Sequence, residues 1–237
     1  MGEAFLQVEA IEAGYSETQV LFGVSLTVGA GEALTLLGRN GMGKTTTLMA
    51  VMGTVARLRG DIRFRGESIW QAKPHAVARR GIALVPEGRR IFPNLSAHEN
   101  LLAGARNASG AADPWTVDRI YALFPQLAER RRSMGSLLSG GEQQMLAIGR
   151  ALMTNPDLLM LDEAAEGLSP VMQSRIWEVL RVLKEQGLAI LVVDKDIRTL
   201  GALADRHFIL EKGRTVWQSD SAALLAADGP TSRYLGV

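Results

Sequence analysis

Hydrophobic residues along the chain gather in short runs, and these runs alternate with stretches in which apolar residues recur at helical spacing. The short runs predict buried strands, which we place at 33–37, 82–85, 158–161, 190–193 and 208–210. The stretches between them have the spacing of helices with one buried face. Strands that alternate with helices are typical of an α/β fold built on a mostly parallel sheet.

Two parts of the chain depart from this alternation. Segments 7–11 and 21–28 indicate antiparallel β-structure near the N-terminus. Residues from about 90 to 150 show helical patterns and no good strand. Within this helical part, Ser96 and Glu99 have the spacing of a capping box, in which each side chain accepts a hydrogen bond from the other residue's backbone N–H group.

A later helix is marked at both ends. Ser169 stands at the N-cap position and Pro170 suits the first helical position. Apolar residues then recur on one face, and Gly187 is the expected end of the helix. The sequence therefore predicts a helix that begins at 170 and ends before 187.

Composition narrows the class of protein. The chain has 237 residues, of which 47% are hydrophobic and 22% charged, so it can bury a large core. Cysteine is absent, which excludes disulfides, zinc fingers and iron–sulfur sites. The net charge of +1 argues against a dedicated nucleic-acid binder, and we interpret the basic run 130–132 as a solvated helix face. Because the start is acidic and no apolar run reaches the length of a membrane span, we expect the protein in the cytoplasm.

One glycine-rich segment has a phosphate-binding pattern. Residues 38–45 match G-x-x-x-x-G-K-[ST], the P-loop, between the predicted strand 33–37 and a helical pattern that ends at Gly53. The backbone N–H groups of such a loop surround phosphates, while Lys44 contacts the β- and γ-phosphates and Thr45 binds Mg²⁺. The predicted nucleotide-binding residues of this segment are Gly38, Arg39, Asn40, Gly41, Met42, Gly43, Lys44, Thr45 and Thr46.

Two acidic residues end another predicted strand. Asp162 and Glu163 directly follow the apolar run 158–161. Placed beside the P-loop strand, Asp162 would hold Mg²⁺ through its water shell. Glu163 would point to the opposite side and accept a proton from an attacking water. Alone, a strand end that simply meets solvent would be the better interpretation, but the P-loop in the same chain favours the catalytic one.

Residues 138–144 read Leu-Ser-Gly-Gly-Glu-Gln-Gln. Ser139 and Glu142 have the spacing of a second capping box, and apolar residues at helical spacing follow. The start of such a helix offers unpaired N–H groups and a positive dipole end, and the two glycines let an anion approach closely. We therefore expect an anion at this helix end.

Together these motifs resemble the ATP-binding subunit of an ABC transporter, in that family's order and spacing and over essentially the whole chain. The resemblance is closest to the smaller of the two ATPase subunits of branched-chain amino-acid importers. The segments that carry it are 37–41, 85–93, 138–149 and 166–170.

The resemblance implies a single ABC ATPase domain over 1–237 with a P-loop NTPase fold. Segments 1–89 and 151–237 would form a RecA-like α/β core with an N-terminal antiparallel β part. The inserted helical lobe, 90–150, would carry the signature. Two such subunits dimerise head to tail, so that each ATP lies between the P-loop of one and the signature of the other. The signature residues would be Ser139, Gly140, Gly141 and Glu142.

Two further residues take roles from the resemblance. Tyr15 falls where the family places an aromatic ring that stacks on adenine, with ordinary strand packing as the alternative. Glu87 falls where many relatives have a glutamine that senses the γ-phosphate. A carboxylate at this position could bind Mg²⁺ directly or through water, but it would also repel the γ-phosphate.

Three positions depart from the wider family. Ala164 and Ala165 replace the usual Pro-Ser/Thr, and Ser169 replaces a usual acid. Lys195 stands at the switch position, where the family has histidine or glutamine. Lys195 could grip the γ-phosphate as a catalytic residue, or pair with Glu163 and lower the pKa of that base. Our hypothesis is slow hydrolysis at this chain's own ATP site, with more turnover at the sister subunit's site.

The resemblance implies an ATPase that uses ATP and Mg²⁺ to drive a transporter. Its partners would be a second ABC ATPase subunit, different or identical, two transmembrane permease subunits and, indirectly, an extracellular or periplasmic solute-binding protein. This predicts a peripheral protein on the cytoplasmic face of the inner membrane, serving uptake of branched-chain amino acids or a related small polar solute. The alternative is a soluble, non-transport ABC ATPase, which the lack of a long coiled-coil insertion and of a basic surplus disfavours.

Overall fold

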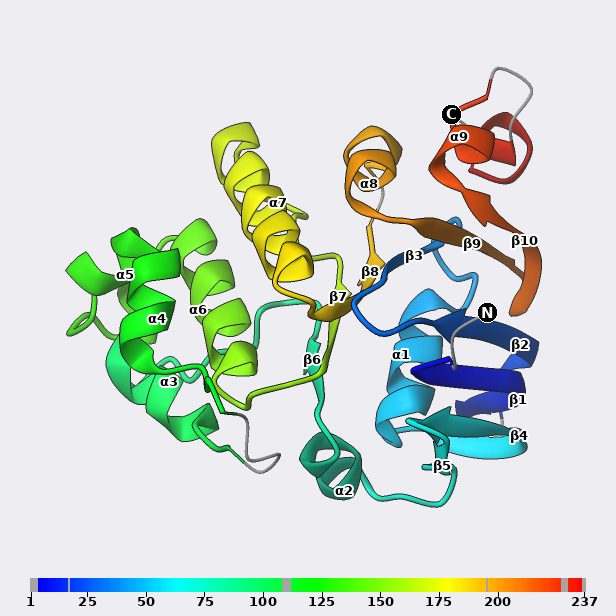
Figure 1. Cartoon of the computed structure of the whole chain (residues 1–237), viewed down its shortest axis with the longest axis horizontal. Helices are drawn as coiled ribbons and strands as arrows, with labels where there is room; N and C mark the ends of the chain where they lie inside the picture. The colour runs from blue at the N-terminus through cyan, green and yellow to red at the C-terminus, as the bar shows by residue number, and fades with distance from the viewer. Residues whose placement is uncertain (1–3, 17, 108–111, 195, 227–229, 236–237) are drawn as a thin grey trace.

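The computed structural model describes residues 4–16, 18–107, 112–194, 196–226 and 230–235. A large sheet occupies the middle of the molecule, with helices α3 to α6 at one end and a smaller sheet at the other (Figure 1). This is the α/β fold with an N-terminal antiparallel part and an inserted helical segment that the sequence predicts.

The large sheet has six strands in the order β10-β9-β3-β8-β7-β6. All neighbours are parallel except β9 and β10. The five predicted strands are present, with β7, β8 and β9 slightly longer than expected, whereas β10 was not predicted. The strands are β3 (Ala33–Leu37), β6 (Ile82–Val85), β7 (Leu158–Asp162), β8 (Ala189–Val193), β9 (Arg206–Glu211) and β10 (Arg214–Asp220).

The small sheet is antiparallel, in the order β2-β1-β4-β5. Strands β1 (Leu6–Tyr15) and β2 (Thr18–Val28) were predicted, whereas β4 (Ala56–Phe64) and β5 (Glu67–Ser68) were not. Strand β4 places arginines at alternate positions, and only its last part is buried. Its apolar signal is therefore too weak to show in the sequence.

The helical segment contains the two predicted capping boxes. Ser96 Oγ accepts from Glu99 N at the start of α3, and Ser139 Oγ accepts from Glu142 N at the start of α6. The only strand-like feature among the described residues of 90–150 is an isolated bridge between Ser96 and Met134. Its helices are α3 (Ala97–Gly104), α4 (Val117–Leu123), α5 (Pro125–Glu129), the 3₁₀ turn η1 (Gly135–Leu137) and α6 (Gly140–Leu152).

The remaining helices pack on the two sheets. Helix α1 follows the P-loop as predicted, and α7 begins and ends as predicted. The side chain of Ser169 nevertheless makes no capping hydrogen bond; its carbonyl accepts from Gln173 N instead. These helices are α1 (Lys44–Met52), α2 (Pro74–Arg79), α7 (Pro170–Glu185), α8 (Ile197–Leu203), α9 (Ser221–Leu224) and a π-helical turn, η2 (Thr231–Leu235).

The interpretation of the basic run 130–132 as a helix face is wrong. Helix α5 ends at Glu129, and the three arginines lie in the turn that follows. They are exposed, as a solvated group should be. The short α5 begins at Pro125, one residue after α4 ends, and Arg130 is already its C-cap, with its backbone N–H group donating to the carbonyls of Gln126 and Ala128.

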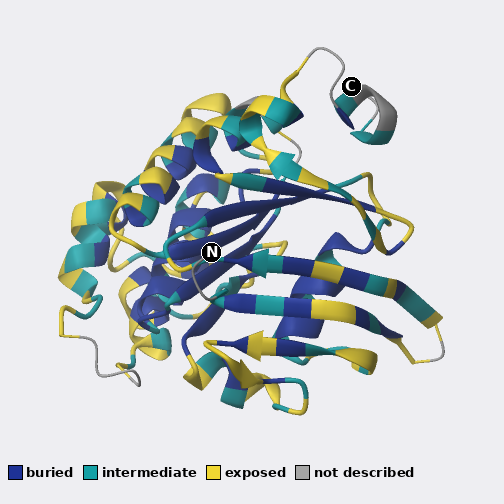
Figure 2. Cartoon of the chain, turned by 45° about the vertical axis from the view of Figure 1, so that its right-hand side comes forward, coloured by how far each residue is buried: buried dark blue, intermediate teal, exposed yellow. Residues whose placement is uncertain are grey.

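Apart from the edge strand β10, the strands of the large sheet are mostly buried on both faces, so they read as continuous apolar runs. In β7, Leu158 and Met160 face one core with helix α1 and the small sheet. Leu159 and Leu161 face the other core with helices α6 and α7. The central strands are therefore buried throughout, while the small sheet alternates between buried and exposed positions (Figure 2).

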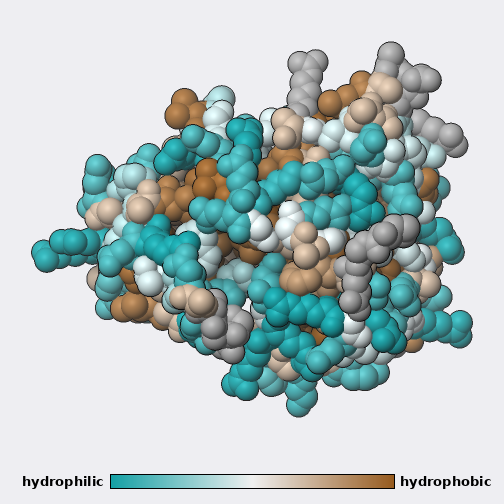
Figure 3. Space-filling model, in the orientation of Figure 1, coloured by the Kyte–Doolittle hydropathy of each residue, from teal (hydrophilic) through white to brown (hydrophobic). Residues whose placement is uncertain are grey.

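The surface seen in Figure 3 is largely hydrophilic, with hydrophobic patches between polar side chains. Two apolar residues are notably exposed: Leu137 at 77% and Val171 at 78%. Among the described residues, no helix is both long and apolar enough to span a membrane.

Candidate functional site

The P-loop connects β3 to α1. Both Gly38 and Gly43 have backbone conformations that suit glycine, with φ of 145° and 101°. A Cβ atom at Gly38 would lie 2.5 Å from the Leu210 carbonyl oxygen, and one at Gly43 would lie 2.7 Å from a methyl group of Leu21. The loop can therefore pass this close to β9 and β2 only with glycine at these two positions.

Lys44 begins α1 and is almost completely buried. Its Nζ atom donates to the carbonyl oxygens of Gly38 and Arg39, at 2.8 and 3.0 Å. The ammonium group thus lies across the loop, where it faces the space that the loop encloses. Thr46 is also buried, while Asn40 is exposed.

Asp162 ends β7, but its strand does not lie beside the P-loop strand as we expected. Strand β8 separates β7 from β3. The carboxylate still reaches the loop, because Thr45 Oγ1 donates to Asp162 Oδ1 at 3.2 Å. Parallel strands end at the same edge of the sheet, so one intervening strand does not prevent this contact.

The environment of Asp162 is unusual for an acid. It is 1% exposed, and its Oδ2 atom is buried without a hydrogen-bond partner among the described residues. Burial raises the pKa of its carboxyl, the hydrogen bond from Thr45 opposes this rise, and the nearby carboxylate of Glu87 adds to it. A buried acid with an unsatisfied oxygen suggests that a cation completes the site.

Glu163 follows in a left-handed backbone conformation, with φ of 51°. Its N–H group donates to the Val193 carbonyl at 2.8 Å, which fixes this turn against β8. Such a conformation costs a non-glycine residue about 1–3 kcal/mol and is often found at functional sites. Here it directs the Glu163 side chain away from the sheet and toward the P-loop pocket.

Three carboxylates meet at this point. The nearest ligand oxygens of Glu87, Glu163 and Glu166 all lie within 4.8 Å of one another. Glu87 comes from the loop after β6, and the other two from the loop after β7. We did not single out Glu166 as a site residue, because its place beside Glu87 depends on the pairing of two strands distant in sequence.

The P-loop and these carboxylates line one pocket of about 490 Å³. Its lining comes from α1, β2 and the loops after β3, β6 and β7, and it includes most of the predicted nucleotide and metal residues. Its lining is Val20, Asn40, Gly41, Gly43, Lys44, Thr45, Thr46, Glu87, Glu163 and Glu166.

The residues 139–142 are not part of that lining. Glu142 accepts from Ser139 N at 2.7 Å and lies 3.5 Å from Arg130 Nε. A Cβ atom at Gly141 would meet the Met172 side chain at 2.4 Å, so α6 packs closely on α7 here. The first turn of α6 thus keeps the N–H groups of a helix start near the surface, apart from the chain's own P-loop pocket.

Two predicted site residues, Tyr15 and Lys195, are not among the described residues that line the P-loop pocket. Tyr15 ends β1 and is 48% exposed, so its ring is not packed in the core as an ordinary strand residue would be. Adenine stacking by Tyr15 stays a prediction. Lys195 lies outside the described residues, so the hypothesis about the switch position also stays a prediction.

The donor set fits a magnesium ion. Mg²⁺ prefers oxygen ligands, and one or two carboxylates with phosphate oxygens are its usual partners in nucleotide sites. The unpartnered Asp162 Oδ2, the Thr45 hydroxyl and the carboxylate of Glu87 supply such oxygens at the edge of the pocket. The buried ammonium of Lys44 provides the positive charge that a triphosphate requires.

Known proteins share this fold and sequence pattern. A sequence model of the family described as "ABC transporter" matches residues 21–166. The branched-chain amino acid transport ATP-binding protein BraG of Pseudomonas aeruginosa is 40% identical, over 98% of this chain and 99% of BraG. The lipopolysaccharide export ATP-binding protein LptB of Escherichia coli is 34% identical, over 98% of both chains. A solved ATP-binding subunit of an ABC transporter has a TM-score of 0.80 at 28% identity, covering 91% of this chain and 90% of its own.

The nucleotide pocket and these relatives define an ATP-hydrolysing P-loop protein. The chain belongs to the family of ABC transporter ATP-binding subunits. It therefore binds ATP and is an ATPase, and it is similar over nearly its whole length to ATP-binding proteins of branched-chain amino acid transport and of lipopolysaccharide export.

Proposed function

We propose that the chain powers the uptake of branched-chain amino acids, or of a related small polar solute, as one ATPase subunit of an ABC importer. The similarity to BraG over nearly the whole of both chains carries this proposal. The similarity to LptB supports an export system as a second candidate, which ranks lower because the identity is lower. A soluble, non-transport ABC ATPase is the third, and no relative described above supports it.

We assign the site residues as follows. The P-loop from Gly38 to Thr46 and the Lys44 ammonium bind the triphosphate, and Tyr15 stacks on adenine. Thr45, Asp162 and Glu87 hold Mg²⁺, which would neutralise charge on the phosphates. Glu163 accepts the proton of the attacking water. Ser139, Gly140, Gly141 and Glu142 contact the ATP of a partner subunit.

The surface supports such a partner. Leu137 is 77% exposed and lies two residues before Ser139, and Val171 is 78% exposed at the start of α7. A second ATPase subunit that covers these two side chains and the start of α6 would explain why apolar residues are exposed beside a predicted anion-binding helix end. In this proposal, the lobe formed by 1–89 and 151–237 binds ATP, and the helical lobe 90–150 carries the signature.

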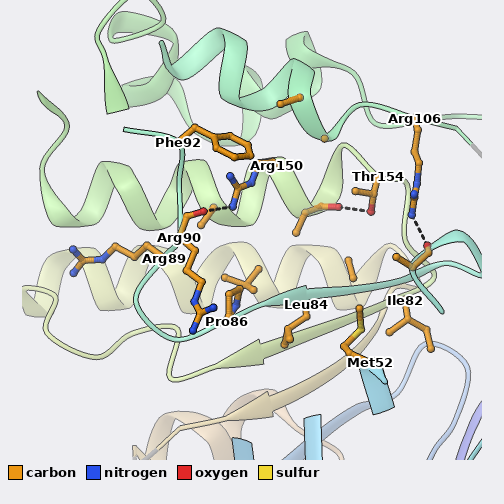
Figure 4. A pocket seen from close by; sticks show the side chains of 17 residues that line it. Met52, Ile82, Leu84, Pro86, Arg89, Arg90, Phe92, Arg106, Arg150 and Thr154 are labelled. Carbon is orange, nitrogen blue, oxygen red and sulfur yellow. Dashed lines mark hydrogen bonds between the residues drawn. The ribbon is translucent and has the colours of Figure 1, made fainter. Parts of the chain in front are cut away.

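A second surface suits a membrane subunit. A groove of about 450 Å³ lies between β6, α3 and α6 (Figure 4). Leu84, Pro86 and Phe92 contribute apolar area, and the lining contains four arginines and no acidic residue. A short amphipathic segment with an acidic residue fits this chemistry. Two permease subunits that dock here would hold the protein peripherally on the cytoplasmic face of the inner membrane.

The assignment of Glu163 makes a first prediction. Glu163→Gln keeps the size of the side chain but cannot accept the proton, so steady-state ATP hydrolysis should fall by roughly a hundredfold or more. ATP binding should persist, because the P-loop is unchanged. Phosphate release by the purified complex measures this. Turnover at the wild-type rate would remove Glu163 as the base, whereas Glu211→Gln, at an exposed acid of β9, should change nothing.

One experiment tests the whole proposal. Tagged Glu163→Gln protein, held with Mg²⁺-ATP, is purified from detergent-solubilised membranes of its own cell, and every co-purifying chain is identified. A second ATPase and two permeases with an associated amino-acid-binding protein support import. Lipopolysaccharide-export components would favour the second candidate, and only soluble partners or ribosomes would favour the third.

A further inference from the structure

Glu166 is an acid of the P-loop pocket to which neither the motifs nor the site assignment above gives a role. It lies in the turn after β7, and its N–H group donates to the Glu163 carbonyl oxygen at 3.2 Å. Glu166 is exposed and contributes to the lining of the pocket. A charged side chain in this place acts on whatever enters the pocket.

The turn that carries Glu166 is held in place by helix α7. Gln173 Nε2 donates to the carbonyl oxygens of Ala165 and Leu168, both at 3.2 Å. These two carbonyls lie on either side of Glu166 and Gly167, and Gly167 has a φ of 68° that suits glycine. The backbone is thus fixed on both sides of Glu166, which keeps its carboxylate at the edge of the pocket.

The described lining of the pocket carries more negative than positive charge. Within it, Lys44 is the only cationic side chain, whereas Glu87, Glu163 and Glu166 are acidic. One carboxylate oxygen from each of these three acids lies within 4.8 Å of the other two. Like charges at such distances repel one another, and the same charges repel the phosphates of a nucleotide. The pocket therefore favours a ligand whose negative charge has been reduced.

The neighbouring Asp162 independently points to a cation. Asp162 is 1% exposed, yet its Oδ2 atom has no hydrogen-bond partner among the described residues, while Thr45 donates to the other oxygen. A buried carboxylate oxygen without a donor is costly unless a cation meets it. A bound Mg²⁺ ion removes about half of the negative charge of ATP, so the metal-bound nucleotide meets far less repulsion from the pocket acids than metal-free nucleotide does.

We propose that Glu166 is a specificity-determining residue, whose carboxylate makes the pocket select nucleotide that carries a divalent cation and reject metal-free nucleotide. Glu87 and Glu163 repel metal-free nucleotide as well, but they have assigned roles as metal ligand and base. Glu166 acts through its charge alone, since it neither holds the cation nor takes up a proton. This role rests on the proposed assignment of the triphosphate to the P-loop and of Mg²⁺ to Asp162, and it does not depend on the transported solute.

Nucleotide binding to the full chain tests this selection without hydrolysis. The Kd of a non-hydrolysable β,γ-imido ATP is measured by titration calorimetry at low salt, once with excess Mg²⁺ and once with EDTA. The wild type should bind the Mg²⁺ form more tightly. Glu166→Gln removes the charge and keeps the size of the side chain, so its Kd in EDTA should fall by roughly tenfold, whereas its Kd with Mg²⁺ should change by less than about threefold. Salt at about 0.5 M should reduce the effect in EDTA, because it screens exposed charges.

Two further variants separate the charge of Glu166 from its place in the fold. Glu166→Asp keeps the charge and should keep the wild-type preference for the Mg²⁺ form. Glu185→Gln removes an exposed acid at the end of α7, which leads into the start of β8, away from the P-loop edge of the sheet, and it should leave both Kd values unchanged.

The proposal is overturned by a Glu166→Gln chain whose Kd in EDTA stays at the wild-type value, or falls no more than its Kd with Mg²⁺ does. A Glu166→Asp chain that behaves like Glu166→Gln would overturn it as well, because the charge would then not be the cause. A wild-type chain that binds the nucleotide in neither condition would also refute the nucleotide assignment of the pocket. Failure of the importer assignment would instead appear in the co-purified partners and leave these Kd values unaffected.

Discussion

His207, a residue of β9, is a buried side chain that makes the stability of the fold depend on pH. It is completely buried, and this burial lowers the pKa of its imidazole to about 4, against opposing effects of Asp205 and Asp220. The Ser221 hydroxyl donates to the Ala204 carbonyl at 2.9 Å, so its oxygen accepts from His207 Nε2 at 2.8 Å. The neutral ring is therefore the form that the fold stabilises.

We expect the free energy of unfolding to decrease as the pH falls. The unfolded histidine takes up a proton near pH 6.5, whereas the folded one does so only near pH 4. Between these values His207 removes up to about 3 kcal/mol of stability. Urea unfolding of the wild type and of His207→Gln between pH 7 and 4 measures this difference. The free energy of unfolding should depend less steeply on pH in His207→Gln than in wild type, whereas His75→Gln, which replaces an exposed histidine, should keep the wild-type dependence. An equal pH dependence in His207→Gln and wild type would refute the assignment.

At the scale of elements, α1 is held at its C-terminal end by an arginine of β4. Arg57 Nε donates to the Ala50 carbonyl at 2.8 Å, Nη2 to Val51 at 3.2 Å and Nη1 to Ile69 at 3.0 Å. Carbonyl groups at the end of a helix lack intrahelical partners, and a cation is favourable there. Arg57 thus joins the P-loop helix to the small sheet.

Arg57→Met keeps the apolar part of the side chain and removes the guanidinium donor from these carbonyls, of which Ala50 keeps the hydrogen bond from the Gly53 N–H group. We expect the free energy of unfolding to fall by about 2–3 kcal/mol, because hydrogen bonds to a charged group are lost in a partly buried place. Arg59→Met is the matched control on the same strand, since Arg59 is exposed, and it should stay within about 0.5 kcal/mol of wild type. Chemical denaturation at pH 7 compares the two; similar losses would mean that the helix does not depend on Arg57.

The elements also show which features a sequence can predict. The capping boxes at Ser96 and Ser139 and the P-loop depend on spacings within one turn or one loop, so their patterns are readable directly. The meeting of Glu87 with Glu166, in contrast, joins segments far apart in the sequence, which the pairing of β6 with β7 brings together. Strand β4 was missed for the same reason: its pairing with β1, rather than its own apolar pattern, makes it a strand.

At the scale of the whole molecule, folding brings carboxylates together at one edge of the large sheet. Asp162 is buried there, and Glu87, Glu163 and Glu166 surround the adjoining pocket. Burial and the charge of Glu87 both raise the pKa of the Asp162 carboxyl, so the ionised form opposes folding in the absence of a cation. The stability of the molecule is therefore tied to the ligand that occupies this edge.

Asp162→Asn should separate the cost of burying the carboxylate from the stability gained when a cation and nucleotide bind. Without ligand, the variant should melt at a higher temperature than wild type, because the amide removes a buried charge that lacks a full set of partners. With Mg²⁺ and a non-hydrolysable ATP at a hundred times its Kd, the wild type should gain about 2.7 kcal/mol, or roughly 5–10 °C, and EDTA should remove much of that gain. The variant should show little difference between Mg²⁺ and EDTA. Calorimetry of both proteins measures these melting temperatures, with Glu211→Gln as the exposed-acid control. An Asp162→Asn variant that melts below wild type without ligand, and that keeps the Mg²⁺-dependent gain, would show that Asp162 serves the fold rather than the metal.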